Sequence, residues 1–515
     1  MPDGIGQQGQ TQWAQWWQAR QVSEAKKSHV KTLLILGASG DLTGRLLLPG
    51  LAALISKGDQ PDLILAGAGS PDFTPKDWSN RVTEAFANAR TKASGDGAAH
   101  LDRIARQTTY TALDVTAPGE LGKLLATCEG PIALYFALPP TVSQKACEVL
   151  TPEEVPEGTS LVMEKPFGSS AESAHALTKT LTRLVPEESI QRVDHFRGKA
   201  TVFNILGLRF ANRFLEPLFS SEHVAKMEIF YDEDLALESR AGYYDHAGAL
   251  RDMIQSHLLQ ILALLTLNAP ATLGERDLRD HIGSVLRATK VPTDYTKSTR
   301  RARYTAGTSR GHHVPDYTSE DGVDRTNNTE TLAEIEVEIN NSRWSGVPFI
   351  LRSGKALAQP RKEAVITFKP VAHLPQGFTG NDSPTRLRIG FGPDILQLEL
   401  DVNGPGDMYN LDRVGLSAQL NTPDLLPYGE VLAGVLAGDP TLSVRDDTAE
   451  QCWRIIEPVL AAWSNDEVPM EEYPAGSNGP THWMTSQEVE LESEPMKGLL
   501  PGTELSPQDA PPAAG

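Results

Sequence analysis

The sequence predicts an α/β domain with a Rossmann-like, doubly wound parallel sheet, followed by a larger α+β domain with a mainly antiparallel sheet. Strand-like and helix-like segments alternate up to about residue 190, which is typical of a parallel sheet with helices on both faces. After about residue 200, short segments of alternating apolar and polar residues are separated by Gly, Pro and Asn turns. The 515 residues are too many for one simple core, which agrees with two domains or more.

In the first domain, apolar runs and helix-like segments can be assigned in order. The run 32–37 ends in glycine and is predicted as a buried strand; 63–69 and 132–138 are predicted as further strands, and 160–168 as a strand together with its exit. Helices are predicted between them, over residues 45–58, 78–90 and 143–150. This alternation of strand and helix is the pattern that predicts the parallel sheet.

The second domain begins with a strand over 223–233 and a long apolar helix over 249–267. The alternating segments that follow are predicted as strands over 333–340, 348–354, 364–370, 385–392 and 395–402. They imply a large sheet with many antiparallel neighbours.

These patterns divide the chain into an N-terminal extension (1–30), a first domain (31–193), a second domain (194–495) and a tail (496–515). The extension is rich in Gln and carries Trp13, Trp16 and Trp17 at helical spacing, so it is either a short docked amphipathic helix or a floppy segment. The Pro-rich tail is predicted to be disordered.

Composition excludes several classes of partner. The net charge of −20 disfavours nucleic acid and anionic membranes, so the basic stretch 297–304 is interpreted as a solvated loop. An anionic substrate would need a local basic pocket. The three cysteines, Cys128, Cys147 and Cys452, lack the spacing of a metal or redox site. With no signal core and no membrane-length apolar run, the protein is expected to be cytoplasmic.

A glycine-rich turn, residues 37–50, connects the first predicted strand to the first helix. Gly37 and Gly40 would let the backbone approach a pyrophosphate at the helix N-terminus, which predicts a dinucleotide cofactor, NAD or NADP. Thr43 stands where a third Gly or Ala is usual. The candidate cofactor-binding residues are Gly37, Ser39, Gly40, Asp41, Leu42, Arg45, Ser70 and Lys165.

The choice between NAD and NADP stays open. The residue after the second strand usually reads the adenine ribose, where an acid favours NAD and a nearby Arg favours NADP. Here Ser70 is the first polar side chain, and Arg45 on the first helix is the nearest cation in the sequence.

Three further stretches carry chemically useful side chains. Lys165, in "EKPFG", lies at the carboxyl end of a predicted parallel strand, where open α/β sheets bind ligands. "RVDHFRGKA", residues 192–200, is either an exposed polar loop or one wall of a site for an anion. His257 lies in the long apolar helix, as a satisfied core histidine or as a catalyst. Catalysis would require a partner carboxylate, for which Asp194 is the candidate.

Nine blocks, in order, resemble the glucose-6-phosphate dehydrogenase family. They extend from about residue 35 to 480 and read "GASGDL", "ALPPTV", "EKPFG", "RVDHFRGK", "LRFAN", "GYYDHAGALRDMIQSHLLQ", "TET", "RWSGVPFILRSGKAL" and "AGSNGP". The resemblance implies oxidation of glucose 6-phosphate to 6-phospho-glucono-1,5-lactone with hydride transfer to NAD(P)+, the opening step of the pentose phosphate pathway. It also implies a homodimer or homotetramer with the large second sheet as the dimerisation surface. The reaction itself needs no metal, and no metal-binding cluster is expected from the sequence.

At matching positions the resemblance implies three catalytic residues. His257 would take the proton from the C1 hydroxyl, Asp194 would pair with it, and Lys165 would lie between sugar and nicotinamide. The same resemblance implies the substrate-binding residues His195, Lys199 and Tyr428 for the phosphate, and Glu233, Asp252 and Lys355 for the sugar hydroxyls.

Several positions depart from the family pattern. Phe196 and Arg197 replace the usual Tyr-Leu, and Gly69 and Leu46 stand where basic residues are usual near the cofactor. These departures leave NAD use open and motivate an alternative, a related dehydrogenase that acts on another aldose or anionic sugar. A non-catalytic cofactor-binding regulator is a third hypothesis, disfavoured because every expected acid–base residue is present.

Overall fold

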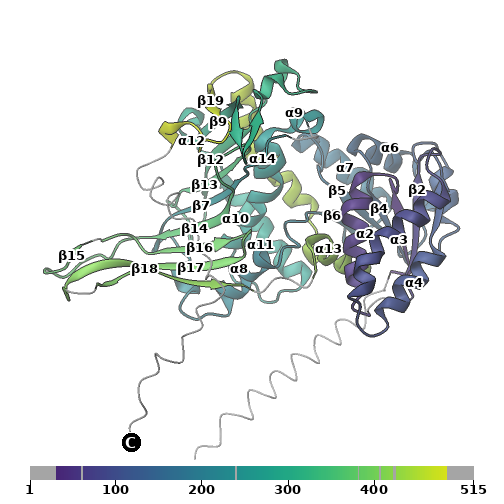
Figure 1. Cartoon of the computed structure of the whole chain (residues 1–515), viewed down its shortest axis with the longest axis horizontal. Coiled ribbons are helices and arrows are strands. Elements are labelled where there is room, and N and C mark those ends of the chain that lie inside the picture. Colours follow the sequence, from purple (N-terminus) through teal and green to yellow (C-terminus); the bar gives the residue numbers. More distant parts are fainter. Residues whose placement is uncertain are drawn as a thin grey trace, which may run out of the picture. The chain divides into compact units, whose positions relative to one another are not determined.

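The computed structural model describes residues 30–58, 62–237, 241–380, 382–404, 407–420 and 425–483 (Figure 1). The chain forms two compact units. The first contains Met1–Ala200, Pro270–His281 and Asp424–Glu450, and the second contains Thr201–Ala269, Ile282–Pro423 and the chain from Gln451 onward. The N-terminal extension, predicted as either a docked helix or a floppy segment, and the tail predicted to be disordered lie outside the described residues. The boundaries at 30, 193 and 495 stay predictions.

The first unit is built on a six-stranded parallel sheet with the order β3-β2-β1-β4-β5-β6. This order is the usual one of a dinucleotide-binding doubly wound fold, so the predicted fold class is confirmed. The strands are β1 (Thr32–Leu36), β2 (Ile64–Gly69), β3 (Thr109–Ala112), β4 (Ile132–Phe136), β5 (Ser160–Glu164) and β6 (Ile190–Val193).

Helices cover both faces of this sheet. Leu33 and Ile35 of β1 pack in one apolar cluster, and Leu34 and Leu36 pack in another, because successive side chains of a strand point to opposite faces. The first cluster includes side chains of α2 (Leu48–Ile55), α3 (Pro75–Thr91) and α13 (Pro427–Leu436). The second includes side chains of α6 (Pro140–Val149) and α7 (Ala171–Leu184). Two further helices are α4 (Gly97–Gln107) and α5 (Glu120–Leu125).

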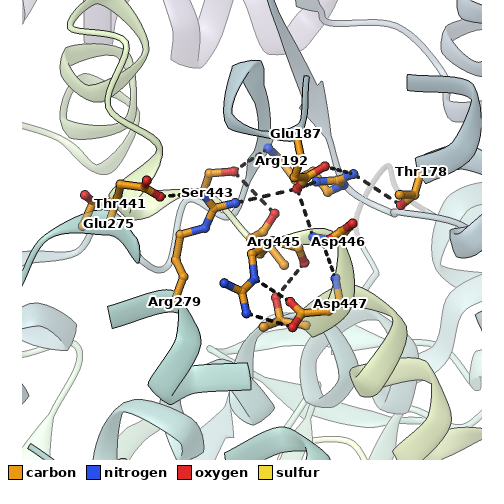
Figure 2. Close-up of polar contacts among 12 residues, drawn as sticks. Thr178, Glu187, Arg192, Glu275, Arg279, Thr441, Ser443, Arg445, Asp446 and Asp447 are labelled. Atoms are coloured by element: carbon orange, nitrogen blue, oxygen red, sulfur yellow. Dashed lines mark hydrogen bonds and ion pairs between the residues drawn. The ribbon is translucent and has the colours of Figure 1, made fainter. Parts of the chain in front are cut away.

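Within the first unit, ionic contacts join the segments 270–281 and 424–450 to the end of the parallel sheet. The Glu187 carboxylate lies 2.6 Å from Arg192 on β6 and 3.7 Å from Arg279, and it accepts a hydrogen bond from the Asp446 amide (Figure 2). The start of α11 (Glu275–Ala288) and the start of α14 (Asp446–Ser464) are thereby held to the end of the parallel sheet. Val30 also donates its amide proton to the carbonyl of Leu436 at the end of α13.

The second unit contains an 11-stranded mixed sheet in which antiparallel pairs predominate, as predicted. Its order is β15-β18-β17-β16-β14-β7-β13-β12-β9-β19, with β8 paired to β12. The long strands β17 and β18, with the short β15 beside their far end, project beyond the rest of this sheet (Figure 1). The strands are β7 (Val224–Asp232), β8 (Thr289–Lys290), β9 (Thr299–Thr305), β12 (Leu332–Ile339), β13 (Phe349–Gly354), β14 (Arg361–Phe368), β15 (Thr379–Gly380), β16 (Arg386–Gly390), β17 (Ile395–Asn403), β18 (Asn410–Gln419) and β19 (Met470–Pro474).

The long helix predicted over 249–267 is confirmed but has two parts. A π-helical segment, η5 (Leu250–Leu258), is followed by the fully buried α-helix α10 (Leu259–Thr266). A similar π-helical turn, η1 (Thr43–Leu47), precedes α2 in the first unit. The remaining helices of this part are α8 (Ala200–Phe210), α9 (Ala241–Ala249) and α12 (Tyr295–Ser298), and a small hairpin pairs β10 (Gly307–Ser309) with β11 (His312–Val314).

The basic stretch 297–304 is not a solvated loop, so that interpretation was wrong. Most of it forms β9, and the Arg301 side chain is buried. Its guanidinium donates to the Val468 carbonyl and forms an ion pair with Asp466. A strand buries every second side chain, and partners more than 160 residues away make the buried charge tolerable. Among the described residues, none of the helices is both long enough and apolar enough to cross a bilayer.

Candidate active site

The glycine-rich turn lies where the chain leaves β1 at the carboxyl edge of the parallel sheet. Gly37 has φ +85°, and a Cβ there would lie 2.1 Å from the Ala137 carbonyl oxygen, so this position requires glycine. Gly40 donates its amide proton to the carbonyl of Gly37, and the helix starts at the next residue. The buried Thr43 hydroxyl donates to the same Gly37 carbonyl at 3.0 Å, so Thr43 stabilises the turn where a third Gly or Ala is usual.

This turn fits a dinucleotide. The first amides of a helix have no partner within the helix and carry the positive end of its dipole, so the helix that starts at Asp41 can bind the diphosphate. Ser39, Asp41 and Leu42 belong to the turn and the first helical residues, as the sequence predicts. Arg45 is exposed and forms an ion pair with Asp41 at 3.1 Å. These residues would hold the diphosphate and adenosine parts of the cofactor.

Arg81 on α3 is a cation at this turn that the sequence reasoning missed. Its Nη1 donates to the carbonyl oxygens of Ala38 and Gly40 at 3.1 and 3.0 Å. Its guanidinium also lies 5.0 Å from the centre of the Phe73 ring. Arg81 lines an open hollow of about 270 Å³ beside the turn. No local signal marks it, because it lies more than 40 residues after the turn that it contacts.

Ser70 directly follows β2, as predicted. Its hydroxyl accepts a hydrogen bond from the Asp72 amide, and its carbonyl accepts one from the Tyr110 hydroxyl at 2.7 Å. The side chain is exposed at the edge of the sheet. It can donate to a ribose hydroxyl, and it brings no charge that would select between NAD and NADP.

Lys165 follows the last residue of β5, at the carboxyl edge of the sheet, as predicted. The residue before it, Glu164, accepts a hydrogen bond from the buried Tyr135 hydroxyl at 2.5 Å. Burial raises the pKa of Glu164 to about 7, although the bond from Tyr135 and the charge of Lys165 act against the rise. Glu164 is a second residue that the sequence reasoning did not single out, because its partner lies on another strand.

Residues 194–199 form a tight turn directly after β6. The amides of Arg197, Gly198 and Lys199 donate to carbonyls three residues earlier, and the Asp194 carboxylate accepts the Phe196 amide at 2.9 Å. Of the two interpretations of this stretch, an exposed polar loop is therefore excluded: Asp194 and Phe196 are buried and the turn is internally bonded.

Three candidate phosphate ligands gather around this turn. The His195 ring stacks on the Tyr428 ring, with 5.5 Å between centroids and an interplanar angle of 12°. The Lys199 Nζ lies 4.5 Å from the centre of the Phe196 ring, which also contacts His195. An imidazole, a phenol and an ammonium group thus lie together in the first unit. The Phe196 ring contacts two of the three residues, His195 and Lys199.

Arg197 has a structural role. Its buried guanidinium donates to the carbonyl oxygens of Ser443 and Thr441 at 2.6 and 3.0 Å. Burial lowers the pKa of Arg197 to about 10, and the nearby Asp194 opposes the effect. The side chain is therefore charged at neutral pH, and its two terminal nitrogens are both hydrogen-bonded to carbonyl oxygens. It is neither solvated nor directed at a ligand.

In the second unit, Glu233 and Lys355 follow two adjacent parallel strands. β7 and β13 pair in register with Asp232 opposite Gly354, so the next residue on each strand lies at the same sheet edge. The Glu233 carboxylate lies 2.8 Å from Lys355 Nζ and 3.5 Å from Lys362 Nζ. Burial raises the pKa of Glu233, but the two ammonium groups outweigh it and hold the pKa below its ordinary value.

Asp252 and His257 both lie on the π-helix η5, and both are buried. The Tyr243 hydroxyl donates to the Asp252 carboxylate at 3.2 Å. π-helical segments are rare and often occur at functional sites. Glu233, Asp252, His257 and Lys355 are thus placed in the second unit, whereas the other candidates belong to the first, and the pairing of Asp194 with His257 stays a prediction.

Comparison with known families matches almost the whole described chain. Residues 34–204 match the model described as "Glucose-6-phosphate dehydrogenase, NAD binding domain", and residues 206–490 match "Glucose-6-phosphate dehydrogenase, C-terminal domain".

Curated proteins named glucose-6-phosphate 1-dehydrogenase are similar over nearly their full length. That of Gluconobacter oxydans (strain 621H) is 37% identical over 463 residues, which are 87% of this chain and 94% of that protein. That of Treponema pallidum (strain Nichols) is 36% identical, over 87% of this chain and 92% of that protein.

Solved structures give the same result. The crystal structure of glucose-6-phosphate 1-dehydrogenase from Mycobacterium avium matches with a TM-score of 0.76 and 32% identity, over 88% of this chain and 96% of that one. A glucose-6-phosphate dehydrogenase in complex with its substrate glucose 6-phosphate matches with a TM-score of 0.79 and 26% identity, over 92% and 100% of the two chains.

Proposed function

The chain belongs to the glucose-6-phosphate dehydrogenase family, and on this premise we propose that it oxidises glucose 6-phosphate at C1 to 6-phospho-glucono-1,5-lactone. The hydride acceptor is NAD or NADP. The observation that carries the proposal is the turn after β6, where His195 and Tyr428 stack and Lys199 lies beside them, in the same unit as a dinucleotide-binding turn. This combination suits a phosphorylated substrate of a nicotinamide-dependent enzyme.

The phosphate group of the substrate is assigned to His195, Lys199 and Tyr428. A sugar phosphate is close to a dianion at neutral pH, and an ammonium and an imidazole give charge-assisted hydrogen bonds that a phenol hydroxyl extends. Stacking on Tyr428 restricts the orientation of the His195 ring. Binding energy from this remote group can orient the reacting carbon.

The sugar hydroxyls are assigned to Glu233, Asp252 and Lys355. The Glu233–Lys355 pair offers an acceptor and a donor side by side at the edge of β7 and β13. The Glu233 carboxylate can accept a hydrogen bond from one sugar hydroxyl, and the Lys355 ammonium can donate one to the next. Two such bonds determine which face of the sugar ring is turned towards the protein. Asp252 provides a second carboxylate from the π-helix.

His257 is assigned as the general base. A neutral imidazole, with a reference pKa of about 6.5, can accept the proton of the C1 hydroxyl on a ring nitrogen near neutral pH. Asp194 is assigned as the carboxylate that fixes the tautomer and stabilises the imidazolium. When bound, the nicotinamide supplies the hydride acceptor, and Lys165 is assigned to the space between it and the sugar.

The test is initial-rate formation of reduced nicotinamide with glucose 6-phosphate and each cofactor in turn. We expect turnover by the wild-type enzyme, and a loss of kcat of roughly 10²- to 10⁴-fold in His257→Asn with near-normal binding of the sugar phosphate. Near-normal kcat in that variant would show that another group is the base. Faster turnover of a different sugar would reject glucose 6-phosphate as the substrate.

Three other proposals accompany this function. We infer that the enzyme acts in the cytoplasm, in the opening step of the pentose phosphate pathway, as a homodimer or homotetramer. The alternative of another anionic sugar rested on Phe196 and Arg197, and it loses half its support because Arg197 is buried against two carbonyls. Phe196 still lacks the hydroxyl that a tyrosine would offer to a phosphate.

A further inference from the structure

We propose that residues 329–331, the "TET" motif, are a positioning element that fixes the π-helix bearing Asp252 and His257 together with the backbone of Lys355. We call this segment the clamp. The inference rests on the proposed function, since it assigns to the clamp the placement of groups that bind and deprotonate the sugar. The clamp side chains are buried, so they act through the residues they hold.

The first half of the clamp holds the start of the π-helix. The Glu330 carboxylate accepts the amide proton of Leu250, the first residue of η5, at 2.9 Å. The Glu330 carbonyl accepts the amide proton of Ala249. The Thr329 hydroxyl donates to the Asp245 carbonyl on α9 at 2.5 Å. Amides at a helix start need acceptors, and a carboxylate there also suits the helix dipole.

The chain bends sharply where it meets Glu330. Gly248 has φ +67°, and a Cβ on it would lie 2.4 Å from the Glu330 carboxylate oxygen. Because Gly248 has no Cβ, the Glu330 carboxylate can pass close to its backbone and reach the Leu250 amide. Burial raises the pKa of Glu330, and the bond from the Leu250 amide opposes the rise. A buried carboxyl would be costly to keep without such a partner.

The second half of the clamp holds Lys355. The Thr331 carbonyl accepts the Lys355 amide proton at 2.9 Å, and the Lys355 carbonyl accepts a hydrogen bond from the Tyr473 hydroxyl at 2.6 Å. The Thr331 and Tyr473 hydroxyls lie 2.9 Å apart. Both peptide groups of Lys355 are therefore bonded to Thr331 or to its partner.

The direction of these bonds follows from the number of protons. Tyr473 has one hydroxyl proton and donates it to Lys355, so the Thr331 hydroxyl must donate to Tyr473. The same Thr331 oxygen accepts the Tyr304 amide proton at 2.9 Å. Replacement by valine would keep the shape of Thr331 and leave both Tyr304 and Tyr473 without this partner.

Thr331→Val tests this half of the clamp, with Thr331→Ser as the conservative variant. We expect Thr331→Val to lower kcat/KM for glucose 6-phosphate by roughly tenfold or more, because small displacements of bound groups are costly. The KM for the cofactor should change little, since the dinucleotide turn belongs to the first unit. Thr331→Ser, which retains the hydroxyl, should recover most of the activity.

Thr299→Val is the matched control for general destabilisation. Thr299 is a buried threonine on the adjacent strand β9, and its hydroxyl bonds to the Tyr295 carbonyl and the Trp463 indole N–H. It holds no candidate site residue among its described contacts. We expect a comparable fall in unfolding temperature with unchanged kinetics. Equal kinetic effects in Thr299→Val and Thr331→Val would overturn the positioning role.

The Glu330 variants provide a readout that does not depend on activity. Glu330→Gln keeps an acceptor for the Leu250 amide, whereas Glu330→Leu removes it. Amide hydrogen exchange across residues 248–258 should accelerate in Glu330→Leu and stay near wild type in Glu330→Gln. Unchanged exchange in Glu330→Leu would refute the clamp, whatever the substrate. An inactive wild-type enzyme with accelerated exchange in Glu330→Leu would instead reject the proposed function alone.

Discussion

Glu164 is a partly buried carboxyl group of the first unit, directly before the candidate functional residue Lys165. Tyr135 donates to it, Lys165 follows it in sequence, and Tyr428 and Asp194 are among the groups that affect its pKa. With a pKa raised to about 7, Glu164 changes charge in the range where the enzyme is proposed to work. Its ionisation therefore alters the electrostatic environment of Lys165.

This raised pKa predicts how stability depends on pH. In the unfolded chain Glu164 has its ordinary pKa of 4.5, so the folded state holds the proton more tightly. The stability that this proton gives is complete below pH 4.5 and is lost as the pH rises towards 7. The glutamine in Glu164→Gln cannot titrate. As the pH rises from 4.5 to 7, the denaturation midpoint of Glu164→Gln should therefore rise relative to that of the wild type. A difference that is constant between pH 4.5 and 8 would contradict the raised pKa.

Residue types at the site were predictable, but their partners were not. Lys165 follows a predicted strand, so its placement at the sheet edge follows from the pattern. The strand β6 before Asp194, His195 and Lys199 is not among the predicted strands, and the structure alone places these residues at the sheet edge. The partners of Arg197 are not predictable from the sequence, because Ser443 and Thr441 lie 246 and 244 residues away. The sequence carries no local information on such contacts.

At the scale of elements, the turn between β1 and η1 is held from both sides. Thr43 bonds the Gly37 carbonyl from within the helix, and Arg81 on α3 bonds the Ala38 and Gly40 carbonyls. The turn is thus fixed before a dinucleotide binds, which lowers the entropic cost of binding. The guanidinium also leaves a positive charge beside the hollow at the turn.

Arg81→Gln should therefore weaken cofactor binding. We expect a rise of roughly tenfold in the KM for NAD and NADP, from the loss of a charged hydrogen-bond donor, while the KM for glucose 6-phosphate stays near wild type. A larger effect on NADP than on NAD would place the ribose phosphate near Arg81. Arg90→Gln on the same helix, whose partner is Asp102, is the control and should leave both constants unchanged. Equal effects of the two variants would show that only helix α3 is disturbed.

Elements with a strong apolar periodicity were predicted correctly. Elements whose structure depends on strand pairing or on the backbone hydrogen-bond pattern were not. The apolar spacing over 249–267 predicts a helix, but η5 and α10 differ only in backbone hydrogen bonding, which apolar spacing does not distinguish. The stretch 297–304 reads as polar because charged residues dominate it, yet pairing of β9 with β12 and β19 makes it a strand. In both cases the tertiary context supplies the missing information.

At the scale of the whole molecule, the first unit is assembled from three parts of the sequence. Residues 270–281 and 424–450 belong to the first unit, although residues of the second unit lie between them in the sequence. A boundary drawn along the sequence at 193 does not anticipate these returns, because composition does not reveal which distant segment completes a core. α13 packs on α2 and buries apolar residues in the same cluster as β1.

Glu187 is the ionic centre of this assembly and its removal should destabilise the first unit. Its carboxylate faces the buried guanidinium groups of Arg192 and Arg279, whose side chains are 1% and 4% exposed (Figure 2). Glu187→Gln removes the anion that these two cations share. Glu187 is itself 23% exposed, and Arg279 keeps its ion pair with Glu275 at 3.0 Å, so we expect a loss of about 1–3 kcal/mol, between that of an exposed pair and that of a fully buried pair.

Denaturant unfolding, followed by a probe in the first unit, measures this loss. Glu120→Gln breaks an exposed contact with Lys123, and it should leave the midpoint unchanged because surface ion pairs contribute little. Added salt should restore little of the stability lost in Glu187→Gln, since buried charges are poorly screened. If Glu187→Gln were as stable as Glu120→Gln, the three sequence segments would be held by apolar packing alone, and the ionic contacts of Figure 2 would not contribute to the assembly.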